Sequence, residues 1–208
     1  MTLSLIIMGG VLSAYTFLGR SFARSFGVSG GNGASLESQG RLTLAYFSQD
    51  VKTAGGLVTT TLTAPDDFPN MVKLLLPSGA GVQTILYYYN SATTPRYLHA
   101  DDSIDFLFDA TGVEFKSGTL TRVIMSPTRV VRTLHRSLLT CNFTYYDSTG
   151  NPYTIFDPAV ANFSSLSGIK QIAVELTSQA GNRTSGTLTQ VYRVTSPRVI
   201  LPNKQLLR

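Results

Sequence analysis

Few residues of this 208-residue chain have the types and spacing that catalysis or metal binding requires. The histidines are His99 and His135, and the single cysteine is Cys141, six positions after His135. No second cysteine or nearby carboxylate completes a zinc set there. Cys141 lies in an alternating apolar run, so we expect a buried small hydrophobe rather than a nucleophile. The sequence therefore predicts no catalytic residues, and we expect a protein that is not an enzyme.

One acid-rich stretch has ligand types that suit a hard cation. Asp101, Asp102, Asp105 and Asp109 lie within nine positions. Calcium takes several oxygen ligands that converge from a loop, so a calcium site at Asp101, Asp102 and Asp105 is one interpretation. The other is a solvated turn before the strand expected at 104–108. We expect no other cofactor and no other metal.

The basic residues do not form a nucleic-acid reading pattern. The net charge is +5, and Arg122, Arg129, Arg132 and Arg136 form one basic stretch. No exposed aromatic side chains are interleaved with them in the way of a known reader fold. We expect a solvated face or ion pairs between subunits, and we expect that no nucleic acid is required.

The element that sets the organisation is the charge-free apolar run from Met1 to Gly19. As a helix, this run would span about 28 Å at about 1.5 Å per residue, close to the roughly 30 Å apolar thickness of a bilayer. We expect a stem helix over 1–26 and a glycine-rich connector over 27–33, with its breaks at Gly27, Gly30, Gly31 and Gly33. The side chains expected to pack within a membrane or an assembly are Leu3, Leu5, Ile6, Ile7, Val11, Leu12, Tyr15, Phe17 and Leu18.

A second helix and a β-domain follow the connector. Ser35 is a plausible N-cap, and apolar residues at helical spacing predict an amphipathic helix over 35–54. Its stripe, which includes Leu36, Leu44, Phe47 and Val51, is expected to pack on a sheet. Alternating β-rich segments then predict strands at 72–76, 82–89, 104–108, 113–116, 120–125, 129–134, 138–146, 169–177 and 188–194. The predicted fold class is α+β: a long N-terminal hydrophobic helix, a glycine-rich break, and a second helix packed on a mainly antiparallel sheet in a globular domain over 34–208.

In this order of elements the chain resembles the type IV pilin and type II secretion pseudopilin superfamily. The start Met1-Thr2-Leu3 is similar to mature members, and the segments 39–42 and 47–55 resemble the helix of the J- and W-type minor members. The resemblance implies that Met1 is a processed, methylated N-terminus. Leu5 stands where the family usually has a glutamate that neutralises a neighbouring N-terminal amine, as in a class that lacks this glutamate at filament tips.

The resemblance also implies a function. It is that of a structural subunit of an extracellular pilus-like or pseudopilus filament, polymerised through the apolar stem. The implied partners are further copies in a helical filament, other pilins and an inner-membrane assembly machinery. The implied location is the bacterial inner membrane before assembly and the cell surface afterwards. The alternative is a membrane-anchored monomeric binding or secretion-accessory domain.

Overall fold

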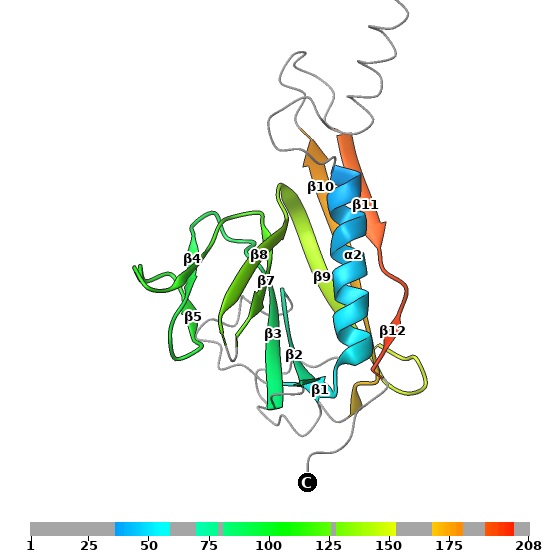
Figure 1. Cartoon of the computed structure of the whole chain (residues 1–208). Coiled ribbons are helices and arrows are strands. Elements are labelled where there is room, and N and C mark those ends of the chain that lie inside the picture. Colours follow the sequence, from blue (N-terminus) through cyan, green and yellow to red (C-terminus); the bar gives the residue numbers. More distant parts are fainter. Residues whose placement is uncertain are drawn as a thin grey trace, which may run out of the picture.

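The computed structural model describes residues 36–58, 70–78, 81–125, 128–152, 168–180 and 190–201 (Figure 1). One helix, α2, occupies Leu36–Thr53. The strands are β1 Gly56–Leu57, β2 Met71–Ser78, β3 Gly81–Tyr89, β4 Arg96–Leu98, β5 Ile104–Asp105, β6 Val113–Phe115, β7 Leu120–Ile124, β8 Val130–His135, β9 Leu138–Tyr146, β10 Gln171–Ala180, β11 Gln190–Thr195 and β12 Val199–Ile200.

This architecture corrects the predicted fold class. The described residues form a mainly β protein with a single 18-residue helix, rather than an α+β protein built on a long hydrophobic helix. Alternating β-branched and aromatic residues dominate after Leu57, and a helical period is confined to the α2 segment. The predicted long helix falls on residues outside the described ranges, as do the connector glycines. Among the described helices, none has the length and apolarity to cross a membrane.

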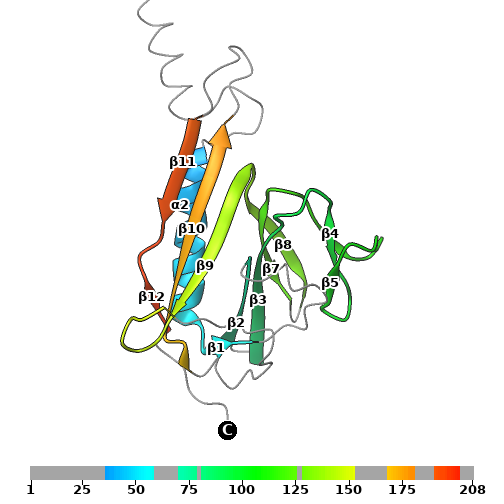
Figure 2. The ribbon, with the colours of Figure 1, turned by 180° about the vertical axis from the view of Figure 1, so that it is seen from behind.

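The strands form three sheets, and all pairings between the described strands are antiparallel. The largest sheet has the order β1-β2-β3-β7-β8. In the second sheet β10 pairs with β9 along one edge and with β11 and β12 along the other. The third sheet, β5-β4-β6, lies at the side of the molecule away from α2, as Figure 2 shows from behind.

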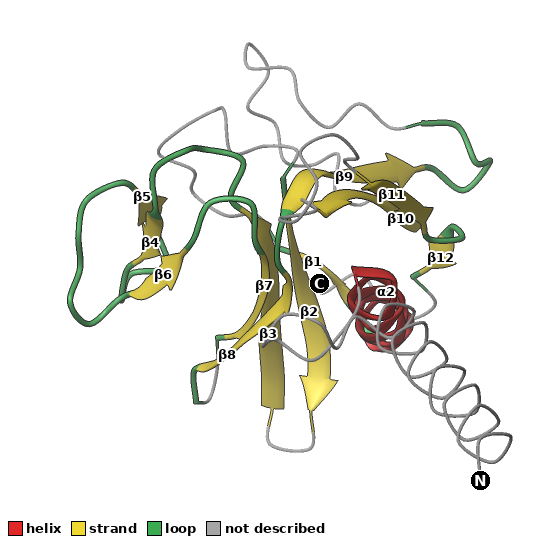
Figure 3. Cartoon of the chain, turned by 90° about the horizontal axis from the view of Figure 1, so that it is seen from above, coloured by secondary structure: helices red, strands yellow, loops and turns green. Residues whose placement is uncertain are grey.

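Helix α2 lies in the angle between the two larger sheets, where it contacts strands of both (Figure 3). Glu37 in its first turn and Lys52 in its last turn match the helix dipole. Phe47 and Val51 are fully buried in the main core, and Leu44 packs against that core from a half-buried position. Leu36, the first residue of the helix, is half-buried and is not part of the core cluster.

Strand β3 separates two cores, and its three consecutive tyrosines point alternately to one core and the other. Tyr87 and Tyr89 face the main core beneath α2. Tyr88 faces a second core, where its ring lies 4.6 Å from that of Phe115. Leu98 and Ile104 also belong to this second core and are fully buried. Both faces of the largest sheet are therefore covered, one by the helix and one by the β5-β4-β6 sheet.

A buried ion pair joins α2 to the largest sheet. Asp50 accepts hydrogen bonds from Arg122 Nε at 2.7 Å and Arg122 Nη2 at 3.2 Å, and from the Tyr87 hydroxyl at 2.6 Å. Burial and the Asp50 charge raise the pKa of Tyr87 well above its usual range. Burial lowers the pKa of Arg122, but the hydrogen bond and charge of Asp50 raise it overall. No pattern in the sequence predicted this buried acid, which holds α2 against β3 and β7.

Candidate functional site

The candidate site lies on the segment of residues 96–116, called here the β4–β6 lobe, which contains β4, β5 and β6. The lobe lies between β3 and β7 in the chain, and its inner side chains form part of the second core. Its outer face carries Tyr97, which lies opposite Asp105 on β5 and Glu114 on β6. Paired residues of antiparallel strands project to the same face, so two carboxylates flank this ring.

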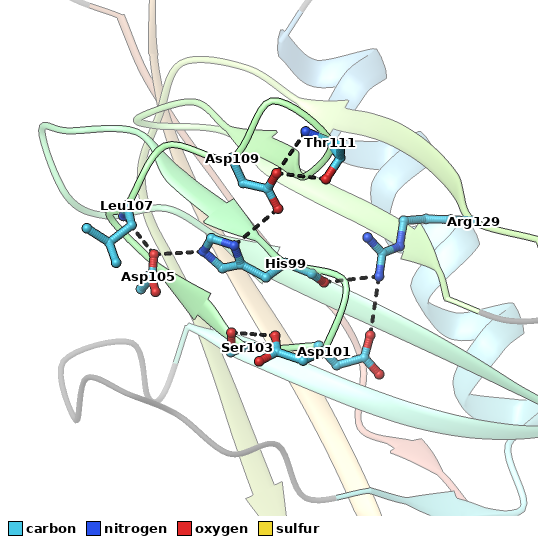
Figure 4. A network of polar contacts seen from close by, with 9 residues as sticks. His99, Asp101, Ser103, Asp105, Leu107, Asp109, Thr111 and Arg129 are labelled. Atoms are coloured by element: carbon cyan, nitrogen blue, oxygen red, sulfur yellow. Dashed lines mark hydrogen bonds and ion pairs between the residues drawn. The ribbon is translucent and has the colours of Figure 1, made fainter.

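His99 contacts an aspartate at each end of the loop that follows β5, Asp105 at its start and Asp109 at its end. Its Nε2 lies 2.8 Å from Asp105 Oδ1, and its Nδ1 lies 3.2 Å from Asp109 Oδ2 (Figure 4). The backbone N–H of Leu107 donates to Asp105, and both the N–H and the hydroxyl of Thr111 donate to Asp109. We call His99, Asp105 and Asp109 the His99 clamp.

The electrostatics of the His99 clamp favour a protonated imidazole. A neutral imidazole has one N–H, whereas both ring nitrogens of His99 face carboxylate oxygens. The hydrogen bond with Asp105 is the largest cause of the raised pKa of His99, and Asp109 adds to it. In return the His99 hydrogen bond lowers the pKa of Asp105. The Thr111 hydroxyl is the main cause of the lowered pKa of Asp109. The clamp is thus a pair of hydrogen bonds between one imidazole and two carboxylates, which become charge-assisted when the imidazole is protonated.

Between the two ends of the clamp the chain exposes three consecutive large apolar side chains. Phe106, Leu107 and Phe108, called here the apolar loop, are 67%, 60% and 78% exposed. The Phe108 ring meets Tyr97 edge-on at 5.5 Å, and Arg96 lies 6.0 Å from the Phe106 ring centre. The strand predicted at 104–108 ends at Asp105, and beyond it the backbone N–H groups of Leu107 and Thr111 donate to the Asp105 and Asp109 side chains.

The three aspartates considered as calcium ligands each bind a different partner. Asp101 accepts from the N–H and hydroxyl of Ser103, and both bonds lower its pKa. Asp102 faces Arg129 at 3.4 Å and Lys73 at 3.7 Å. Asp105 belongs to the His99 clamp. No group of three or more metal-ligand side chains in the described part of the chain is arranged to hold an ion.

The basic stretch is similarly divided among partners. Arg122 binds Asp50, and Arg129 binds Asp102 and the carbonyl of His99. Arg132 stacks on Tyr46 at 4.5 Å and donates to its hydroxyl. Arg122 and Arg132 both lie near the Tyr46 ring, whereas Arg129 lies beside His99, and each of the three has a partner of its own among the described residues.

The remaining predicted site residues fall into two groups. Cys141 is buried, and burial raises the pKa of its thiol well above the usual range, in keeping with a structural role. Met1, the nine apolar stem residues and the connector glycines lie outside the described residues. Their expected roles in processing, assembly and hinge motion stay predictions.

Comparisons of the sequence with protein-family models and with curated proteins found no match. The residue types alone would not have revealed the His99 clamp, since its members are separated by six and ten positions. The one usable signal was the run Phe106-Leu107-Phe108 between two aspartates.

Proposed function

We propose that this protein is a structural subunit of an extracellular filament of the type IV pilus or pseudopilus kind. The observation that carries the proposal is the charge-free apolar run Met1–Gly19, joined by a glycine-rich segment to a β-domain that begins with α2. That domain buries its own core under α2 and the lobe. The apolar run consequently needs a bilayer or other copies of the chain to cover it.

The apolar run is costly to expose to water. Burying one large apolar side chain stabilises by about 1.5–3 kcal/mol. About a dozen such groups therefore strongly favour burial of the run, in a bilayer or among copies of the chain, and packing between copies decides the choice of the filament over lipid. The same run would rest in the inner membrane before assembly, so one surface serves storage in lipid and cohesion in the filament.

A charge placed in the apolar run tests this proposal. Leu12→Asp puts an uncompensated carboxylate among apolar neighbours, which costs about 2.5–3.5 kcal/mol at a bilayer centre and is also unfavourable in a packed filament core. Ser29→Asp, in the glycine-rich segment, is the matched control. We expect Leu12→Asp to abolish surface filaments and Ser29→Asp to leave them. Filaments of normal yield from Leu12→Asp cells would contradict the proposal.

Replacement of the whole run separates this function from that of an anchored monomer. A membrane anchor needs only length and apolarity, whereas a filament core also needs matched packing between copies. Residues 1–19 exchanged for an unrelated apolar sequence of equal length should keep the chain in the membrane but end filament formation. Unchanged cellular function after this exchange, with no filament at any stage, would favour the anchored binding domain.

A further inference from the structure

A second apolar surface lies on the side of the molecule opposite to the apolar loop. It is a groove of about 440 Å³ between α2 and β12, lined by Ser48, Lys52, Pro197, Arg198, Val199 and Ile200. Pro197, Val199 and Ile200 form its apolar lining, called here its apolar floor, and Ile200 is 61% exposed. We call it the α2–β12 groove, and Figures 1 and 2 place its elements and the β4–β6 lobe at opposite edges.

The rim of the α2–β12 groove is basic. Lys52 stands in the last turn of α2, and neither it nor Arg198 has an ion pair with a carboxylate in the described residues. Arg198 is instead held in place by the Tyr146 ring at 4.2 Å and the carbonyl of Gly150 at 3.1 Å. The groove therefore combines an apolar floor with two cations that lack anionic partners.

The β4–β6 lobe has the opposite charge. Residues 96–116 hold two cationic and five carboxylate side chains, a formal net charge of −3 with His99 neutral. Because the whole chain has a net charge of +5, the remaining residues carry +8. Glu114 and Asp101 are exposed on the lobe, and neither forms an ion pair with a lysine or arginine among the described residues. An acidic lobe with an apolar loop thus complements a basic groove with an apolar floor.

The His99 clamp holds the apolar loop in place before it binds anything. Hydrogen bonds to carboxylates fix both ends of the loop, so the loop loses little conformational entropy when it binds. Clustered aromatic side chains are also the usual source of binding energy at interfaces.

We propose that the apolar loop of one copy docks in the α2–β12 groove of a second copy. Because the two surfaces differ, the contact is heterologous, and a heterologous contact that does not close into a ring propagates into an open helical assembly. The contact rests on the proposed filament function and deepens it by assigning the surfaces through which neighbouring β-domains meet.

Charge favours a second copy over two other possible occupants of the α2–β12 groove, a bilayer surface and the chain's own last residues. An anionic bilayer surface attracts the basic rim of the groove but repels a lobe with a net charge of −3, so it would cover only one of the two surfaces. The chain's own last residues carry Lys204 and Arg208 and no acidic side chain, so they do not complement the basic rim. A second copy supplies both the apolar side chains and the carboxylates.

Cysteine cross-linking of the full chain in cells tests the contact. The double variant Leu107→Cys/Ile200→Cys places one thiol in the loop and one in the groove, at 60% and 61% exposed positions. Leu107→Cys/Val191→Cys is the matched control, because Val191 is 59% exposed but lies on β11 outside the groove. The native Cys141 is buried, so the parent chain serves as the unreactive reference. A short bis-maleimide is added, and products are separated by mass.

We expect the loop–groove variant to give a ladder at multiples of 22.5 kDa and the control variant to give none. Lys52→Glu added to the loop–groove variant should remove the ladder. The inference fails if both variants give equal ladders, or if Leu107→Cys alone gives dimers, since the loop would then meet its own counterpart. It also fails if mass spectrometry finds the loop joined to a different protein.

The outcome separates this contact from the function on which it rests. Filaments that contain the chain but give no loop–groove ladder would overturn the contact and leave the filament function standing. A ladder from cells without filaments would keep the contact and overturn the filament.

Discussion

Asp50→Asn gives the sharpest test of how α2 is held to the sheet. The substitution keeps the size of the side chain and removes its charge. It leaves Arg122, whose side chain is 15% exposed, without a counter-ion, and it weakens the acceptor for the Tyr87 hydroxyl. The change acts on one buried contact between the helix and strands β3 and β7.

The magnitude follows from the burial of the pair. The Asp50 side chain is 8% exposed and receives two bonds from Arg122, so solvent screens the interaction little. Breaking a buried ion pair by removing one partner destabilises by about 3–5 kcal/mol, because a charge stays behind uncompensated. Arg122 keeps its position near the Tyr46 ring, at 5.9 Å, and some contact with water. We therefore expect about 3 kcal/mol, a large share of the about 5–15 kcal/mol that stabilises a typical domain.

Urea unfolding of the detergent-solubilised full chain, followed by circular dichroism, measures this loss. Glu37→Gln is the matched control on the same helix. It breaks the exposed ion pair between Glu37 and Arg41, whose side chains are 50% and 75% exposed respectively. An exposed pair contributes about 0–1 kcal/mol. Arg122→Met in the Asp50→Asn background should recover part of the loss, because it removes the unpaired charge.

Two results would refute this reasoning. One is a free energy of unfolding for Asp50→Asn that equals that of Glu37→Gln. The other is an Arg122→Met loss that simply adds to that of Asp50→Asn, since additivity would mean that the two groups do not interact.

Further predictions concern the histidines and the packing of α2. In NMR titration His99 should titrate above the usual histidine value of about 6.5 and His135 below it, since carboxylates raise the first pKa and burial lowers the second. Stability from His99 is therefore present below about pH 6.5 and lost as pH rises through its raised pKa, whereas stability from His135 is present above about pH 6.5 and lost as pH falls toward its lowered pKa. Urea unfolding at several pH values, with His99→Gln and His135→Gln to assign each limb, checks both signs. Gly40→Leu should destabilise by about 1–3 kcal/mol in thermal unfolding, because even a Cβ there meets Val194 Cγ1 at 3.2 Å. Phe47→Ala should cost about 3–5 kcal/mol, whereas Phe106→Ala, at a 67% exposed site, should change stability by less than about 0.5 kcal/mol.

Local periodicity predicted those parts of the fold that depend on local sequence. The segment 35–54 has an apolar stripe at helical spacing, and the observed helix Leu36–Thr53 lies within it. The alternating run 138–146 matches β9 at both ends. Each of these segments buries one face, so its period reports its structure directly.

Contacts between residues far apart in the chain determine the features that periodicity did not predict. Asp50 was not recognised as a core residue, because its partners are 37 and 72 positions away in the chain. The alternation at 104–108 predicted one strand, but Asp105 turns to His99 and Phe106 and Phe108 remain exposed. A three-residue strand such as β4 carries too little pattern to be found from sequence. The predicted α+β class was wrong because it was built on a long helix in the apolar N-terminal run. The described residues are instead mainly strands.

Electron microscopy of material sheared from the cell surface, joined to intact-mass spectrometry of its subunits, tests the filament function most directly. We expect filaments in which this chain is a repeating constituent. Recovery of the chain in the membrane fraction alone, with sheared filaments absent or free of it, would contradict the claim.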